Sequence, residues 1–380
     1  MAQRFNADQS DHCGPTLPCR CGQPARYVGR RAKTFQSALG ALTLDRAYYH
    51  CVVCDAGFCP RDRALGLQDA SLSPAVTRMV GRVGAMVSFV EGSALMQELA
   101  AVPVDPKQVE RTAEALGREI AADERRRVAP EPPAAPTMYL GMDGTGVPMR
   151  AAALAGRAGK QPDGSAKTRE VKLCTVWTAE GRDAKSIPVR DPGSVSYSAA
   201  IESAASRDTD TVPSAFAQRV DREARRRGFD QALRRVVLGD GALWIWNLAE
   251  EYFPGARQIV DIFHAKQRHD ELDAGQLDAI LHALGVHAET NDEARKCLDY
   301  VTRNHSRMRD PEFRAQGLCV SSGVVEAGCK VVIGTRLKRA GMHWTVAGAD
   351  AIIALRCCLL SGRFEDFWEQ RSAAAAAGTR

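Results

Sequence analysis

The chain has 380 residues, of which 45% are hydrophobic and 26% charged, and its net charge is +5 at pH 7. This composition is typical of a globular protein and excludes disordered, collagen-like and coiled-coil chains. The length exceeds what one hydrophobic core usually fills, so we expect more than one domain. The polar first residues and the lack of an apolar run of about 18 residues predict a cytoplasmic protein with no membrane span.

Cysteines dominate the first predicted module, residues 1–66, which contains six of the twelve in the chain. In a reducing compartment, clustered thiols favour metal binding over disulfides, although buried thiols without a metal are the alternative. Two close pairs supply the proposed ligands: Cys19, Cys21, Cys51 and Cys54. Four thiolates in this pattern bind one tetrahedral zinc ion, so we predict a zinc ribbon. Three nearby residues are alternative ligands, namely His12, Cys13 and Cys59.

The segment between the two cysteine pairs is basic. Arg30 and Arg31 lie in its middle, and Asp45 is the one acid nearby. Such a distribution favours a surface that faces the phosphates of a nucleic acid. Ribbons also bind proteins or only stabilise a fold, so the function of this module stays open.

A helical domain is predicted over residues 67–128. Ser73 before Pro74 is a helix start signal, a second helix covers 88–101, and a third begins at Asp105 and Pro106. Two helices joined by a short turn fit a helix-turn-helix arrangement that binds DNA. An ordinary helical linker domain is the alternative.

Residues 129–136 contain four prolines and therefore predict an extended linker to the last domain, residues 137–371. Apolar strands are expected at 138–142, 170–178, 235–241 and 258–263, with helices over 212–227 and from residue 242. This order, a strand hairpin, a helix, a strand, a helix and a further strand, predicts an α/β fold of the RNase-H-like class.

Three acids of the last domain are candidate catalytic residues. Asp143 and Asp240 each follow an apolar strand, and Glu326 interrupts a mostly apolar helix after two serines. Taken singly, an aspartate before a glycine is more often a turn residue. In the predicted fold the three carboxylates together can hold two Mg²⁺ or Mn²⁺ ions for phosphodiester chemistry.

Several segments resemble one known family. The sequences DGTGVP, LGDGALWIWN, QIVDIFHA and SSGVVEAGCKVVIGTRLKRAGMHW are similar to transposases of bacterial insertion sequences, specifically the Kra-type family related to the Mutator-like superfamily. The resemblance covers nearly the whole chain. It implies a DDE transposase whose acids are Asp143, Asp240 and Glu326, with a helical insertion over about 265–314.

One position departs from the related superfamily, in which a cysteine, two residues and a histidine follow the second catalytic aspartate. This chain has Asp261 in place of that cysteine, followed by His264. His264 either contacts the scissile phosphate or orders the active site, or else it is a structural histidine.

A basic run follows Glu326 without an intervening acid: Lys330, Arg336, Lys338 and Arg339. We expect these side chains to bind DNA phosphates beside the acids, and a solvated helix face is the alternative.

The function expected from these features is that of a transposase. Such an enzyme binds the terminal inverted repeats of its element, hydrolyses phosphodiester bonds and joins the ends to target DNA. It would act as a homo-oligomer on DNA, associated with the nucleoid when bound. The alternatives are a nuclease of the same fold without strand transfer and a non-catalytic DNA-binding regulator that uses the ribbon.

Overall fold

The computed structural model describes residues 2–68, 70–126, 135–159, 161–162, 164–205, 213–261 and 276–377. The chain divides into two compact units. One comprises Met1–Leu116 with Arg363–Arg380, and the other comprises Gly117–Gly362. Within the described part, no helix combines the length and apolarity that a membrane span requires.

The first unit begins with an antiparallel sheet in which each strand pairs with the next along the chain. Its strands are β1 (Thr16–Pro18), β2 (Pro24–Ser37), β3 (Gly40–Cys51) and β4 (Ala56–Phe58). Two short helices belong to the same module, α1 (Ala2–Ala7) and α2 (Pro60–Ala64). Gly40 has φ +99°, a conformation that residues with a Cβ rarely adopt, and it begins β3 directly after the β2–β3 turn.

Three helices follow in the same unit: α3 (Pro74–Met86), α4 (Phe89–Ala100) and α5 (Pro106–Arg126), the last of which continues past Leu116. The Ser73 hydroxyl accepts a hydrogen bond from the N–H of Val76, and Ser88 with Glu91 forms a capping box. These side chains satisfy N–H groups that have no earlier carbonyl in the helix. The predicted helices are confirmed at the starts that the capping residues indicated.

The last helix, α15 (Phe364–Ala377), belongs to the first unit. The Glu365 carboxylate forms ion pairs with Arg82 and, at 2.6 Å, with Arg78 of α3. The sequence places residues up to 371 in the catalytic domain, whereas the structure groups the chain from Arg363 onward with the N-terminal elements. The sequence of α15, FEDFWEQRSAAAAA, carries no local signal for which of two distant segments it will pack against.

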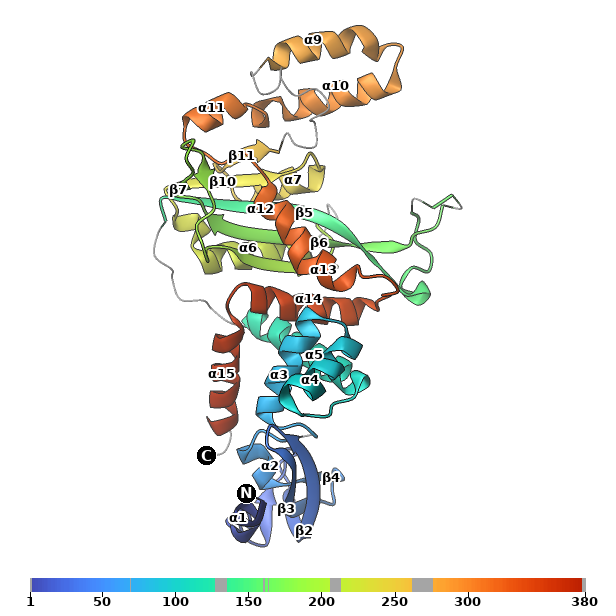
Figure 1. Cartoon of the computed structure of the whole chain (residues 1–380), viewed down its shortest axis with the longest axis vertical. Helices are drawn as coiled ribbons and strands as arrows, with labels where there is room; N and C mark the ends of the chain where they lie inside the picture. Colours follow the sequence, from blue (N-terminus) through green and yellow to red (C-terminus); the bar gives the residue numbers. More distant parts are fainter. Residues whose placement is uncertain are drawn as a thin grey trace. The chain divides into compact units, whose positions relative to one another are not determined.

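The second unit contains a mixed five-stranded sheet with the order β11-β10-β5-β6-β9 (Figure 1). Its strands are β5 (Thr137–Pro148), β6 (Thr168–Thr178), β9 (Ser196–Ala200), β10 (Arg234–Gly239) and β11 (Arg257–Val260). β6 runs antiparallel to both β5 and β9, and β10 runs parallel to both β5 and β11. A small hairpin, β7 (Gly181–Arg182) with β8 (Pro188–Val189), lies outside this sheet.

Four of the five strands agree with the predicted ones, and β9 was not predicted. Its sequence, SYSAA, is short and has serines at two positions, although all five residues are buried. Burial of such a polar segment depends on packing against other elements, which the alternation of apolar residues does not reveal.

Helices cover both faces of the sheet. On one face, α6 (Ala215–Arg227) and α7 (Leu243–Tyr252) pack against Leu140, Met142 and Val237. On the other face, Tyr139 and Leu238 of the sheet share a core with two helices, α11 (Asp310–Ala315) and α12 (Gly323–Gly328). Phe313 of α11 and Val325 of α12 belong to this core. Figure 1 shows α12 and α13 (Thr335–Leu337) crossing β5 and β6.

The expected helical insertion over about 265–314 is described from residue 276 onward. It contains α9 (Leu277–Ala288), α10 (Asp292–Asn304), a short 3-10 turn η4 (His305–Arg307) and α11. The described residues of this unit also contain the 3-10 turns η1 (Ala151–Ala153) and η2 (Phe229–Gln231). Helical content is therefore present where the resemblance implies an insertion.

A π-helix, η5 (Cys329–Gly334), continues α12 and leads into α13. Arg356 of the buried helix α14 (Val346–Leu360) donates hydrogen bonds to the carbonyls of Val331 and Val332 and to the Thr335 hydroxyl. A π-turn shifts carbonyls out of the α-helical pattern, so they need other donors. Burial lowers the pKa of Arg356 to about 10, and the guanidinium therefore stays protonated at neutral pH.

Candidate functional site

The first candidate site is the cysteine cluster of the N-terminal sheet. Cys19 and Cys21 lie just after β1, Cys51 ends β3, and Cys54 lies in the turn before β4. All four Sγ atoms are within 4.8 Å of one another, with Cys19 and Cys54 at 3.5 Å and Cys21 and Cys51 at 3.7 Å. Tetrahedral zinc with Zn–S bonds of about 2.3 Å requires S···S separations of about 3.8 Å. The donor set therefore fits a structural zinc ion.

The alternative ligands lie outside this cluster. The Cys13 thiol approaches the carbonyls of Ser10 and Asp11, and the His12 ring packs edge-on against Tyr27. Cys59 is buried at the start of α2, and burial raises its pKa. The four residues of the two close pairs are thus the ones that the fold gathers.

In the second pair, backbone donors favour a thiolate at Cys51, whereas hydrogen bonds with the Cys21 and Cys19 side chains raise the pKa of Cys54 to about 12. Hydrogen bonds from the N–H groups of Cys54 and Val53, together with the Cys21 side chain, lower the pKa of Cys51 to about 7 despite its burial. A thiolate is the form that binds zinc. The turn geometry therefore prepares Cys51 for metal binding.

The two arginines predicted to face DNA from this module differ in their surroundings. Arg30 forms ion pairs with Asp11 at 3.1 Å and with Asp45 at 2.9 Å, and its side chain is 18% exposed. The exposed Arg31 guanidinium lies 3.5 Å from the centre of the Tyr48 ring. Arg31 presents a free edge to solvent, whereas Arg30 is largely occupied within the module.

The second candidate site lies where parallel strands end. Met142 of β5 pairs with Gly239 of β10, so the next residues, Asp143 and Asp240, occupy matching positions on adjacent strands. Tyr139 and Gly141 point to the face covered by α12, and Asp143 continues that alternation. Val236 and Leu238 point to the same face, and Asp240 continues theirs. The two carboxylates therefore share one end and one face of the sheet.

Local hydrogen bonds orient these carboxylates. Asp143 Oδ1 accepts from the N–H of Gly144 at 2.6 Å. Asp240 Oδ1 accepts from the N–H of Ala242 at 2.9 Å, just before α7 begins. Both side chains are partly exposed. Each aspartate is therefore held by a backbone donor and remains partly accessible to solvent.

Glu326 approaches this site on α12, where its side chain is exposed. Glycines at 141 and 328 allow the helix to lie close to the sheet. A Cβ at Gly141 would overlap Val325, and one at Gly328 would meet Leu173 at 2.9 Å. Burial and the nearby carboxylates of Asp143 and Glu326 raise the pKa of the Cys329 thiol, which is also hydrogen-bonded to Asp143. The carboxylates of Asp143 and Glu326 therefore both lie near the Cys329 thiol.

The three acids are not gathered as tightly as the cysteines. Over the described ranges, the cysteine cluster is the one set of three or more potential ligand side chains that meets the 4.8 Å spacing. The position of the acids is therefore defined by the strands and the helix that present them.

A third aspartate lies beside the first two. Val260 of β11 pairs with Gly239, so Asp261 occupies the position next to Asp240, and its N–H bonds to the Gly239 carbonyl. Asp261 is only 4% exposed. Its Oδ2 accepts from the Ser322 N–H at 2.9 Å and from the Ser322 hydroxyl, and Ser322 begins α12. Asp261 therefore links the sheet end to the helix of Glu326.

Tyr300 of α10 is a neighbour that the sequence did not indicate. Its ring lies so close to Gly241 that a Cβ there would overlap it. Burial, together with the charges of Asp240 and Asp261, raises the pKa of Tyr300 to about 12. The phenol is therefore protonated at neutral pH and lies beside two carboxylates, but no local pattern in α10 distinguishes it from a core tyrosine.

The predicted basic residues after Glu326 separate into two kinds. Lys330, Lys338 and Arg339 are exposed, and Lys338 Nζ contacts the hydroxyl of Thr145, two residues beyond Asp143 on β5. Arg336 is fully buried, with its guanidinium 5.1 Å from the centre of the Trp344 ring. Arg336 therefore does not offer its charge to an external phosphate in this structure. His264 lies outside the described residues.

Comparisons with known proteins define no family for this chain. No protein-family model matches it, and no curated protein matches it. Among solved structures, the Drosophila P element transposase strand transfer complex is similar with a TM-score of 0.27 and 12% sequence identity. That similarity covers 82% of this chain and 84% of that chain. At so low a score it adds no argument to the geometry above.

Proposed function

We propose that the chain is a DNA transposase of the DDE type with an RNase-H-like catalytic unit. The central observation is that Asp143 and Asp240 directly follow the last paired residues of the parallel strands β5 and β10, on the face crossed by the helix of Glu326. The strand directions support this class, since three antiparallel strands followed by two parallel ones is the arrangement expected for it. The Cys₄ cluster supports an accompanying zinc ribbon.

In this proposal Asp143, Asp240 and Glu326 hold divalent metal ions. Bound Mg²⁺ or Mn²⁺ supplies charge neutralisation at the scissile phosphate and makes the attacking oxygen more acidic. Asp261 holds the start of α12 through Ser322 and thereby positions Glu326. The exposed Lys330, Lys338 and Arg339 bind DNA phosphates close by.

The reaction sequence needs no covalent enzyme intermediate. Water attacks the phosphodiester at the element end and releases a 3′-hydroxyl, which then attacks a phosphodiester of the target DNA. Because two ends must be joined, the active species is a homo-oligomer on DNA. The zinc ribbon and the α3–α5 helices recognise the inverted repeats.

The test uses labelled DNA that flanks the coding sequence on each side, incubated with the full chain and Mg²⁺ or Mn²⁺. Cleavage and strand transfer are measured on sequencing gels. We expect Asp240→Asn to lower both by at least about 100-fold, since a metal ligand is lost. The matched control is Asp366→Asn, an exposed aspartate of α15 that should leave both steps unchanged.

The outcomes separate the alternatives. Cleavage without joining by the unaltered protein indicates a nuclease of the same fold. Binding without cleavage indicates a DNA-binding regulator. If Asp240→Asn still cleaves and joins the ends, the assignment of the acids is wrong.

A further inference from the structure

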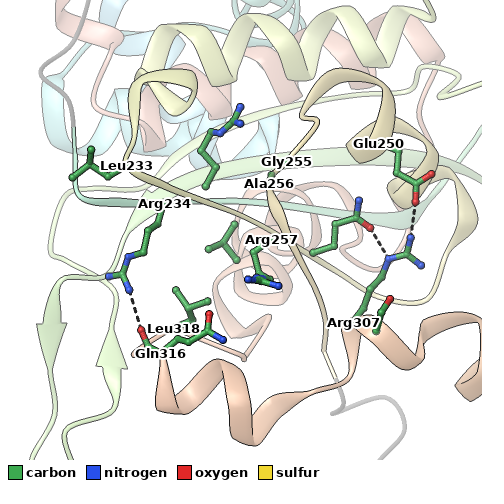
Figure 2. A pocket seen from close by; sticks show the side chains of 13 residues that line it. Leu233, Arg234, Glu250, Gly255, Ala256, Arg257, Arg307, Gln316 and Leu318 are labelled. Carbon is green, nitrogen blue, oxygen red and sulfur yellow. Dashed lines mark hydrogen bonds and ion pairs between the residues drawn. The ribbon is translucent and has the colours of Figure 1, made fainter.

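A basic pocket lies at the other end of the parallel strands, away from the acids. It has a volume of about 670 Å³ and forms where β10 and β11 begin, with η4 and the end of α11 opposite (Figure 2). β10 and the residue after it advance about 20 Å from Arg234 to Asp240, at about 3.3 Å per residue. The pocket is therefore separate from the proposed catalytic site.

Its charge is strongly one-sided. Four arginines line it, namely Arg234, Arg235, Arg257 and Arg307. Glu250 is the one acid in the lining, and its Oε1 accepts from Arg307 at 2.7 Å. Like charges held together around one cavity repel each other unless an anion joins them. The lining thus favours a negatively charged ligand.

Two of the arginines are held in place by neighbouring groups. Arg307 donates from Nε to Gln258 Oε1 at 2.5 Å, and its guanidinium lies 4.8 Å from the centre of the Trp246 ring. Arg234 donates to the Thr137 hydroxyl and to the Gln316 carbonyl, each at 2.9 Å. Figure 2 shows these two side chains on opposite sides of the pocket. Their positions are fixed before any ligand arrives.

Arg257 lies between them and is available. Its side chain is exposed, and its guanidinium lies 5.8 Å from the centre of the Phe313 ring. Among the residues that the structure describes, its guanidinium has no hydrogen-bond or ion-pair partner. A planar guanidinium with unused N–H groups matches the oxygens of a phosphate, to which it can donate two parallel hydrogen bonds.

We propose that this pocket binds a phosphate group, with Arg257 as the principal donor and Arg234 and Arg307 as fixed flanking charges. The phosphate belongs either to a free phosphate compound or to the backbone of a nucleic acid. The binding does not depend on the acids at the opposite end of the strands. It is therefore tested by binding, independently of any cleavage.

The first arm titrates the full chain with inorganic pyrophosphate in a calorimeter. We expect Arg257→Gln to weaken binding at least tenfold and Arg257→Lys to weaken it less, because lysine keeps the charge but not the fork. The matched control is Arg225→Gln, which removes an exposed arginine of α6 that pairs with Asp221 and lies outside the pocket. Melting curves of all variants confirm that each is folded.

The second arm measures anisotropy of a labelled single-stranded oligonucleotide with the same variants. A selective loss for Arg257→Gln with pyrophosphate alone assigns the pocket to a free phosphate compound. A selective loss with the oligonucleotide, in competition with pyrophosphate, assigns it to a nucleic-acid backbone. If Arg257→Gln and Arg225→Gln behave alike with both probes, the proposal is overturned.

Discussion

Asp261 shows how one buried side chain can connect a strand to a helix. Its carboxylate accepts two hydrogen bonds from Ser322, and a hydrogen bond to a charged group contributes about 1.5–3 kcal/mol. We therefore expect Asp261→Asn to lower the free energy of unfolding by about 1–3 kcal/mol in urea titrations. Ser322→Ala, which keeps the backbone donor, should cost less.

The control for this prediction is Asp299→Asn, an exposed aspartate of α10 that should change stability by less than about 0.5 kcal/mol. A positioning role further predicts that Asp261→Asn slows DNA cleavage at a temperature where the variant is fully folded. Full activity of that folded variant would show that the contact serves stability alone.

Asp350 of α14 gives a prediction about pH. Burial raises its pKa above the ordinary value of 3.8, although the N–H of Ile201 donates to its carboxylate at 2.8 Å. A carboxyl whose pKa is raised by folding favours the native state at low pH and loses that contribution as the pH rises through the folded pKa. At neutral pH the charged carboxylate is therefore a cost.

We expect Asp350→Asn to be more stable than the unaltered protein at pH 7, because the amide oxygen still accepts from Ile201 and bears no charge. The advantage should shrink as the pH falls towards about 4. Unfolding titrations at several pH values measure it. An advantage that grows on acidification would contradict the assigned cause.

At the scale of elements, the seat of α12 on β5 depends on Gly141. A Cβ at this position would overlap Val325 and come within 2.9 Å of Trp177. We expect Gly141→Ala to destabilise the protein by about 1–3 kcal/mol, the usual cost of overpacking. Because α12 presents Glu326, the same variant should lose DNA cleavage.

The matched control is Gly285→Ala in α9, where a Cβ would meet nothing within 4 Å. Alanine is preferred to glycine inside a helix, so this variant should gain about 0.5–1 kcal/mol. Thermal unfolding of both variants compares them directly. Equal effects of the two substitutions would rule out close packing as the reason for glycine at 141.

Metal removal is the prediction for the N-terminal sheet. Structural zinc contributes about 10–16 kcal/mol in small zinc modules, so chelation should abolish the amide protection of β2 and β3 in hydrogen exchange. Cys54→Ser should reduce bound zinc from one ion per chain to little or none. Cys13→Ser should retain it, since Cys13 lies outside the cluster.

How far the sequence predicts the elements depends on how local their signals are. Ser73 and Ser88 cap helices through hydrogen bonds to residues only three positions away, so the sequence predicts where these helices begin. The close spacing of the cysteines within each pair likewise predicts the four-cysteine cluster. The burial of Arg336 could not be predicted, because it depends on Trp344 and on a π-helix that α14 supports. The sequence predicts that Asp143 and Asp240 each follow a strand. This prediction is confirmed for Asp240 but wrong for Asp143, because β5 continues to Pro148 through its pairing with β6. Their common face follows only from the strand register.

At the scale of the whole molecule, the first unit is built from both ends of the chain. We expect deletion of residues 363–380 to destabilise this unit, because Phe364 packs near Gly81 and Glu365 pairs with Arg78 and Arg82. Hydrogen exchange of α3 should rise while that of β5 and β6 stays unchanged. Faster exchange of all three elements would mean that the two units unfold together.

This division also sets an order of events during synthesis. Residues 117–362 leave the ribosome as one continuous stretch, and domains generally fold as units while the chain is being made. The N-terminal unit must wait for the last residues before its set of helices is complete. A stop codon placed just before residue 363 would therefore damage the unit that contains α3, although the codons of α3 lie far upstream of the change.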